Sequence, residues 1–85
     1  MRRREAIEKE LEENFMKQGS LFYDPSSERM DIRFGLESYY GGLHCGTGMD
    51  VLINGKWVPT RIELGEDWYL VGIKTDNISG LVVRL

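Results

Sequence analysis

The sequence predicts an α+β, mainly β fold, in which an amino-terminal helix (residues 1–19) precedes a small antiparallel barrel of about five strands (residues 20–85). Three observations predict it: an early stretch with apolar residues at helical spacing, later short segments separated by turn residues, and an Asn-Gly pair typical of tight hairpins. With 85 residues, 41% of them hydrophobic, the chain is long enough for one small domain and too short for a second core.

The helix is predicted from residues 3–18, which contain neither Gly nor Pro and consist mostly of strong helix formers. Ile7, Leu11 and Phe15 repeat every four residues and therefore lie on one face of a helix. Gly19 follows directly, and glycine is the preferred residue just beyond a helix C-terminus. We therefore expect one amphipathic helix that ends at Gly19.

Strand-like segments follow. Residues 21–23 and 30–34 flank the turn residues 24–27 and predict a first hairpin. Residues 35–48 are rich in glycine and predict a long irregular loop. Residues 81–85 predict a final short strand.

Asn54-Gly55 is the clearest local signal, because both central positions of a two-residue hairpin turn need a positive φ angle. It joins residues 49–53 to residues 56–64 and sets their register, so that Leu52 faces Trp57 across the strands. Pro59 lies inside the second strand and cannot donate a hydrogen bond there, so we expect a bulge or a sharp bend at this residue.

A second tight turn at Gly65-Glu66 would place Leu64 opposite Asp67 and extend the sheet to a third strand. The side chains then separate into a core face and an outer face, and both Trp57 and Trp68 lie on the outer face. The core face would carry Met49, Val51, Ile53, Val58, Thr60, Ile62, Tyr69, Val71 and Ile73.

Charge argues against nucleic acid. Residues 1–20 hold five basic and five acidic residues, and the remainder holds six basic and nine acidic residues, which gives the net charge of −3. Binding to a phosphate backbone normally needs a basic face. The alternative is still a nucleic-acid-binding barrel, in which aromatic side chains stack on bases. Its phosphate contacts would be Arg2, Arg3, Arg4, Lys56, Arg61 and Lys74.

The sequence contains no recognisable catalytic group, metal site or cofactor site. Cys45 and His44 are the only residues of their types, and neighbours on an extended chain point to opposite sides, which does not suit a nucleophile and its base. A single cysteine also excludes an internal disulfide and a multi-thiolate metal site. We expect Cys45 to be a small buried residue and His44 to lie in a loop or at the edge of the barrel.

Two resemblances add to this interpretation. The segments 67–72 (Asp-Trp-Tyr-Leu-Val-Gly) and 80–83 (Gly-Leu-Val-Val) are similar to the Trp-containing strand and the closing strand of SH3 domains, which implies a small SH3-like barrel. The runs 44–46, 54–63 and 67–72 also resemble a small bacterial family of unknown function. That family implies a compact β-barrel with no assigned chemistry, encoded in Gram-positive genomes and their mobile elements.

The expected function is a non-enzymatic protein-interaction or accessory module, of a mobile element or phage. Its contact surface is predicted from aromatic residues and an arginine that are typical of interfaces. The predicted contact residues are Tyr39, Tyr40, Trp57, Arg61 and Trp68. Two alternatives concern this face: the helix covers it, or the faces are reversed and the tryptophans fill the barrel. Besides nucleic-acid binding, a further functional alternative is an inhibitor of a host nuclease.

The partner is expected to be another protein. No long apolar segment or cleavable leader is evident, so a cytoplasmic protein without a membrane contact is expected. The helix could pack on its own barrel as a monomer or exchange with a second copy as a homodimer.

Overall fold

The computed structural model describes residues 16–85, and this part is all-β. One antiparallel sheet contains seven strands in the order β3-β2-β1-β7-β4-β5-β6. The predicted α+β class and the count of about five strands are therefore wrong; the part of the predicted helix before residue 16 lies outside the described residues. The strands are β1 (Gln18–Asp24), β2 (Arg29–Gly35), β3 (Ser38–Tyr39), β4 (Gly48–Ile53), β5 (Lys56–Leu64), β6 (Trp68–Leu70) and β7 (Val82–Arg84).

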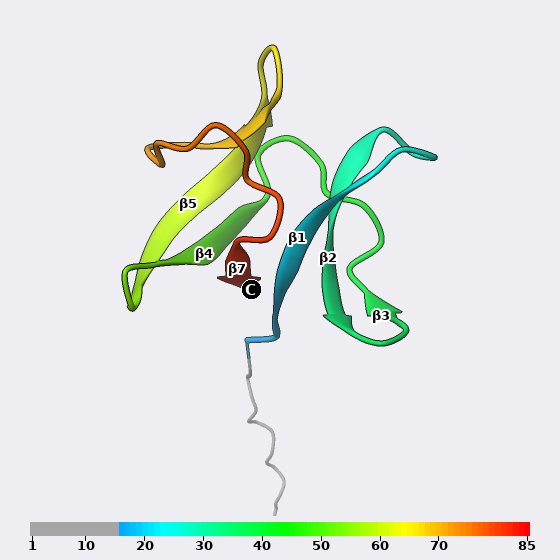
Figure 1. Cartoon of the computed structure of the whole chain (residues 1–85), viewed down its shortest axis with the longest axis horizontal. Helices are drawn as coiled ribbons and strands as arrows, with labels where there is room; N and C mark the ends of the chain where they lie inside the picture. The colour runs from blue at the N-terminus through cyan, green and yellow to red at the C-terminus, as the bar shows by residue number, and fades with distance from the viewer. Residues whose placement is uncertain (1–15) are drawn as a thin grey trace, which may run out of the picture.

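The sheet is strongly bent, and its inner face encloses the core. Figure 1 shows β1, β2 and β3 on one side and β4 and β5 on the other, with β7 between them. The core draws apolar side chains from both sides and from two connections. Its buried members are Leu21, Met30, Ile32, Leu43, Met49, Val51, Ile62, Leu70, Ile78 and Val83. Because β7 pairs with both β1 and β4, this short strand joins the two halves of the sheet.

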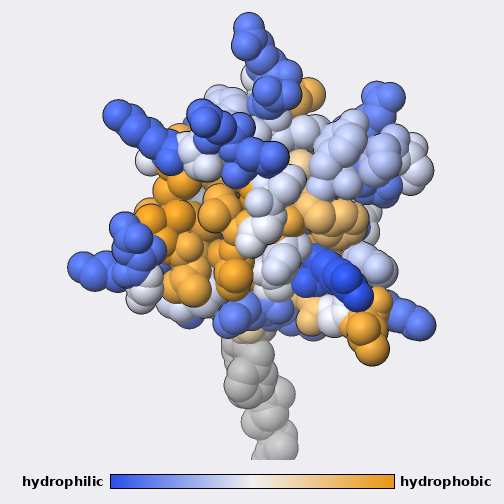
Figure 2. Space-filling view, viewed as in Figure 1, coloured by the Kyte–Doolittle hydropathy of each residue, from blue (hydrophilic) through white to orange (hydrophobic). Residues whose placement is uncertain are grey.

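The core is not fully covered on every side. Figure 2 shows a hydrophobic area on the side of the molecule where Figure 1 places β4 and β5. On these strands Ile53 and Val58 pack against the core but stay only half-buried. The described residues therefore leave some apolar surface of this hairpin in contact with water.

Strand β1 shows why the predicted helix end is wrong. The first hairpin forms as expected, with Leu21 opposite Ile32 and a turn between Asp24 and Arg29. Gly19, however, lies inside β1 and pairs with Val83. A Cβ atom there would meet the carbonyl oxygen of Arg33 and lie 2.7 Å from Cγ2 of Ile32. The glycine is thus needed for a close approach of two strands rather than for a helix C-terminus.

The Asn54-Gly55 hairpin confirms the predicted register. Asn54 and Gly55 have φ angles of 51° and 78°, as the two-residue turn requires, and Leu52 faces Trp57. The register continues through Pro59 without a shift, so no bulge forms there. In such a hairpin the pairs alternate, and Pro59 falls in a pair that exchanges no hydrogen bonds with β4. The position where Pro59 lacks an N–H is therefore on the other edge of β5, the edge that pairs with β6. Pro59 lies on the part of this edge that extends beyond β6.

The next turn is one residue longer than predicted. Residues 65–67 connect the strands, and Leu64 pairs with Trp68 instead of Asp67. A slip of one residue moves every side chain of a strand to the opposite face. Leu70 is consequently buried and Trp68 packs against the core, whereas Tyr69, predicted in the core, is exposed. The prediction that both tryptophans point away from the core is therefore wrong for Trp68.

The glycine-rich region is more ordered than predicted. It contains the short strand β3, and Leu43 is fully buried in the core. The carboxylate of Asp31, a buried residue at 7% exposure, accepts hydrogen bonds from the backbone N–H groups of Ile32, Gly41 and Gly42 at 2.8–3.0 Å. These bonds attach the loop to β2.

The lone cysteine lies further along this loop. Cys45 is exposed, so the expectation of a buried cysteine is wrong. His44 is an exposed loop residue, as predicted, and its carbonyl oxygen accepts a hydrogen bond from the hydroxyl of Thr47 at 2.8 Å. The buried residue of the region is instead Leu43, which fits the usual preference of large aliphatic side chains for the core.

Asp24 closes the turn between β1 and β2. The Ser26 hydroxyl and backbone N–H, followed by the Ser27 hydroxyl, donate hydrogen bonds to its carboxylate. These bonds favour the charged form and lower the pKa of Asp24 below its ordinary value. The turn therefore gains stability at pH values above the ordinary aspartate pKa, and that gain is lost as the pH falls through the lowered pKa.

Candidate binding cleft

The five predicted contact residues do not form one surface. Tyr39 and Tyr40 are exposed at the β3 edge of the sheet, whereas Trp57 and Arg61 lie on β5. Four strands separate β3 from β5 in the sheet order. Trp68 lies apart from both groups, because it is on β6 and packs against the core.

Trp57 already has a partner within the domain. The guanidinium of Arg84 lies 4.3 Å from the centre of the Trp57 ring. The same Arg84 forms an ion pair with Asp50 at 3.0 Å. Because the arginine covers the indole, this part of the outer face serves the stability of the sheet, and it offers a partner less free aromatic surface than predicted.

A double-mutant cycle measures this contact. We expect Trp57→Leu and Arg84→Met to be coupled by about 0.5–1 kcal/mol in unfolding free energy, the usual range for an exposed cation–π pair. Chemical denaturation of the wild type, the two single variants and the double variant gives the coupling. Lys56 is an exposed cation beside Trp57 in the chain, but among the described residues it makes no cation–π contact with the ring. A matched cycle of Trp57→Leu with Lys56→Met should therefore show no coupling. Equal coupling in the two cycles would refute a specific contact.

Of the basic residues proposed for nucleic acid, Arg2, Arg3 and Arg4 lie outside the described residues, and the other three do not gather in one cluster. Lys56 lies at the β4–β5 turn, Arg61 lies further along β5, and Lys74 follows β6. Arg61 also forms an ion pair with Glu63 at 2.9 Å. These placements give the nucleic-acid alternative no support beyond the sequence.

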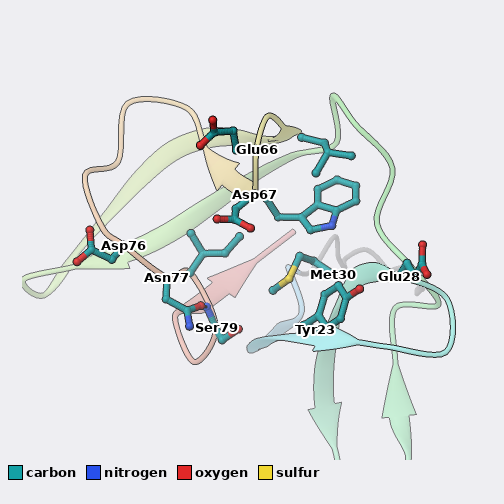
Figure 3. Close-up of a pocket in the computed structure, with 11 residues that line it drawn as sticks. Tyr23, Glu28, Met30, Glu66, Asp67, Asp76, Asn77 and Ser79 are labelled. Carbon is teal, nitrogen blue, oxygen red and sulfur yellow. The ribbon is translucent and has the colours of Figure 1, made fainter.

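A cleft with a volume of about 500 Å³ lies at one end of the inner face. Figure 3 shows its residues converging from the β1–β2 hairpin, the β5–β6 turn and the connection before β7. Aromatic and aliphatic side chains alternate with carboxylates around it. The lining residues are Tyr23, Glu28, Met30, Leu64, Glu66, Asp67, Trp68, Asp76, Asn77, Ile78 and Ser79.

Backbone hydrogen bonds hold the walls of this cleft in place. The Gly80 N–H donates to the carbonyl oxygen of Leu21 at 2.8 Å, and the Leu21 N–H donates to that of Leu81 at 2.9 Å. These bonds attach the connection before β7 to β1, two residues from Tyr23. Within the connection, the Ser79 N–H donates to the Asn77 side chain at 2.8 Å. The cleft is therefore largely preformed, as binding sites usually are.

The base of the cleft is apolar and its rim is acidic. Met30 and Ile78 are buried at the base. Figure 3 shows the carboxylate of Asp67 directed toward the middle of the cleft, while Glu66 and Asp76 lie at its rim. Among the described residues, no Lys, Arg or His contributes to the lining.

Glu28, on the other wall, has a φ angle of 58°, a left-handed conformation that costs a non-glycine residue roughly 1–2 kcal/mol. Its N–H donates to the carbonyl oxygen of Asp24 at 2.8 Å, so this conformation belongs to the β1–β2 turn that forms this wall.

Sequence reasoning missed this cleft because three distant segments build it. Of the predicted contact residues only Trp68 lines it. The available signal was the grouping of carboxylates in two turns, Glu66-Asp67 and Asp76, which by itself is typical of any solvated turn.

Comparison with protein families shows which family the chain belongs to. Residues 19–85 match the profile described as a domain of unknown function, DUF5348. The chain belongs to the DUF5348 family. Every residue that lines the cleft falls within the matched part of this DUF5348 domain. The predicted membership of a family of unknown function is thus confirmed.

A solved structure supports the fold. The DUF5348 domain is similar to the crystal structure of a protein from Ruminococcus gnavus, determined as a structural genomics target, with 57% sequence identity and a TM-score of 0.76. The similarity covers 80% of this chain and 99% of the other. Comparison with curated proteins gives no match. Among residues 16–85, no helix has the length and apolar character to cross a membrane.

Proposed function

We propose that the DUF5348 domain is a non-catalytic protein-interaction module that binds its partner in the cleft between the β1–β2 hairpin and the β5–β6 turn. One observation carries this proposal: a preformed hollow of about 500 Å³ brings an apolar base, two aromatic side chains and several carboxylates to one place. This volume lies within the range of ordinary ligand sites.

The composition of the cleft supports binding rather than chemistry. Within the described part of the chain, Ser79 supplies the only serine or threonine hydroxyl of the lining, and no histidine or lysine lies in the lining as its base. Aromatic side chains such as Tyr23 and Trp68 are common anchors of protein interfaces. The outer face is the weaker candidate, because Arg84 covers the Trp57 ring there.

A matched pair of tyrosines tests the proposal. Tyr23 and Tyr69 are 45% and 46% exposed, but only Tyr23 lines the cleft. We expect Tyr23→Ala to lose the partners that the wild-type domain captures from a lysate of its native cells, since it removes one wall of the cleft. Tyr69→Ala should retain them. Both variants must show the circular dichroism spectrum of the wild type.

Variants on the outer face show which result would contradict the proposal. If Trp57→Ala and Arg61→Ala lose the partners while Tyr23→Ala keeps them, the cleft is not the contact surface. The cytoplasmic location, the mobile-element or phage setting and the choice between a monomer and a homodimer stay predictions from the sequence. The role as an inhibitor of a host nuclease stays one as well. The neighbouring genes would test the genomic setting and the inhibitor role, light scattering would test the oligomeric state, and cell fractionation would test the location.

A further inference from the structure

We infer that the DUF5348 cleft binds a basic, extended peptide segment, with a lysine or arginine side chain inserted between Trp68 and Asp67. This inference rests on the proposed function and assigns the chemistry of the partner. It combines three features of one hollow: its charge, its apolar base and its aromatic walls.

Charge selects a cation. Four carboxylates line the cleft, on Glu28, Glu66, Asp67 and Asp76, and none of residues 16–85 adds a basic side chain to this lining. Within residues 16–85 the ion pairs involve other carboxylates, those of Glu63 and Asp50. Fields of one sign inside a concave surface raise the local concentration of ligands of the opposite sign. The same field repels phosphates and acidic peptides.

The spacing of these carboxylates favours an organic cation over a metal ion. Among the described residues, no group of three or more His, Cys, Asp or Glu side chains is close enough to hold a metal. Figure 3 shows why: Glu28, Glu66 and Asp76 are far apart around the rim, and Asp67 alone is directed inward. Dispersed carboxylates suit a chain that carries several positive charges.

The apolar parts of the cleft match the stem of a long basic side chain. Lysine and arginine bury their methylene groups against apolar surface while the charged end stays near polar groups. Leu64, an exposed residue of the lining, provides most of this aliphatic surface, above the buried Met30 and Ile78 at the base. Trp68 and Tyr23 provide aromatic rings, which attract a cation within about 6 Å of the ring centre.

Three synthetic peptides test the inference with the full chain. Each is a twelve-residue repeat of Gly-Leu-Ser-X, in which X is Lys, Gln or Glu. We expect the Lys peptide to shift the backbone amide resonances of Asp67, Trp68 and Ser79 in nuclear magnetic resonance titrations, and the Glu peptide to leave them unchanged. Raising the ionic strength from ~0.03 to ~0.3 M should lower the affinity for the Lys peptide, because salt screens the exposed carboxylates.

Two charge variants locate the effect. Asp67→Asn should lower the affinity for the Lys peptide about two- to fivefold, the factor that one exposed ion pair supplies. Glu37→Gln removes the same charge from an exposed residue outside the cleft and should change the affinity by less than about twofold. An equal loss in the two variants would show attraction by net charge alone and would overturn the inference.

The remaining outcomes separate the inference from the proposed function. If the Gln or Glu peptide binds the cleft as tightly as the Lys peptide, the cleft binds peptides but does not select a cation, and only the inference fails. If no peptide shifts these resonances although Tyr23→Ala loses the natural partner, the inference again fails alone. If Tyr23→Ala keeps the partner, the proposed function fails as well.

Discussion

Replacing Gly19 by alanine should destabilise the domain by about 3 kcal/mol, at the upper end of the usual cost of overpacking. An added Cβ atom would press on the carbonyl oxygen of Arg33 and the side chain of Ile32. Because one of these contacts is backbone, two strands must move apart to relieve it. We expect the melting temperature to fall by about 12–24 °C for a domain of this size, as measured by calorimetry.

Gly48→Ala is the matched control. Gly48 also lies at a strand position, in β4, but an added Cβ atom would have its nearest neighbour, the Thr60 carbonyl oxygen, at an ordinary 3.8 Å. Its effect should stay within about 1 kcal/mol, since alanine at a compatible position mainly restricts the unfolded chain. A Gly19→Ala variant as stable as Gly48→Ala would show that the close approach of β1 and β2 is absent.

Replacing Asp31 by alanine should cost about 2–4 kcal/mol of unfolding free energy. The carboxylate accepts three backbone hydrogen bonds, and bonds to a charged group are stronger than neutral ones. Without it, the N–H groups of Gly41 and Gly42 lose their acceptor. Chemical denaturation measures the loss, and amide hydrogen exchange at these two glycines should accelerate.

Asp31→Asn and Glu37→Ala complete this experiment. Asparagine keeps a carbonyl oxygen in the place of the accepting oxygen, so Asp31→Asn should lose less stability than Asp31→Ala. Glu37 is exposed in the neighbouring turn, so its removal should leave the stability within about 0.5 kcal/mol. Rapid exchange of the Gly41 and Gly42 amides in the wild type would contradict the anchoring role of Asp31.

The sequence predicted the local elements with tight turn chemistry. Asn54-Gly55 allows a single common hairpin geometry, and its register follows by counting residues. The Gly65-Glu66 turn lacked such a constraint, since Asp67 extends it by one residue and reverses the faces of β6. Trp68 was consequently placed on the wrong side. Gly19 was ambiguous for another reason: glycine suits a helix end and a close strand contact equally well.

The cleft and the loop anchor depend on contacts between distant segments. The alternation of β2 directs Asp31 away from the core, so nothing local shows that the glycine-rich loop folds back and buries its carboxylate. Likewise, Tyr23 and Trp68 are 45 positions apart in the sequence numbering and meet around one hollow only because the sheet bends. Periodicity and turn residues describe neighbours along the chain and cannot reveal such convergence.

The unequal lengths of the strands also affect how copies of this protein behave at high concentration. The two outermost strands of the sheet, β3 and β6, have two and three residues, so each offers few unpaired backbone groups to a second molecule. The longer β5 extends past β6, and there Pro59 withholds an N–H from any incoming strand. Short or proline-blocked margins are a known protection against fibre-like stacking. We therefore expect this small sheet to resist amyloid growth.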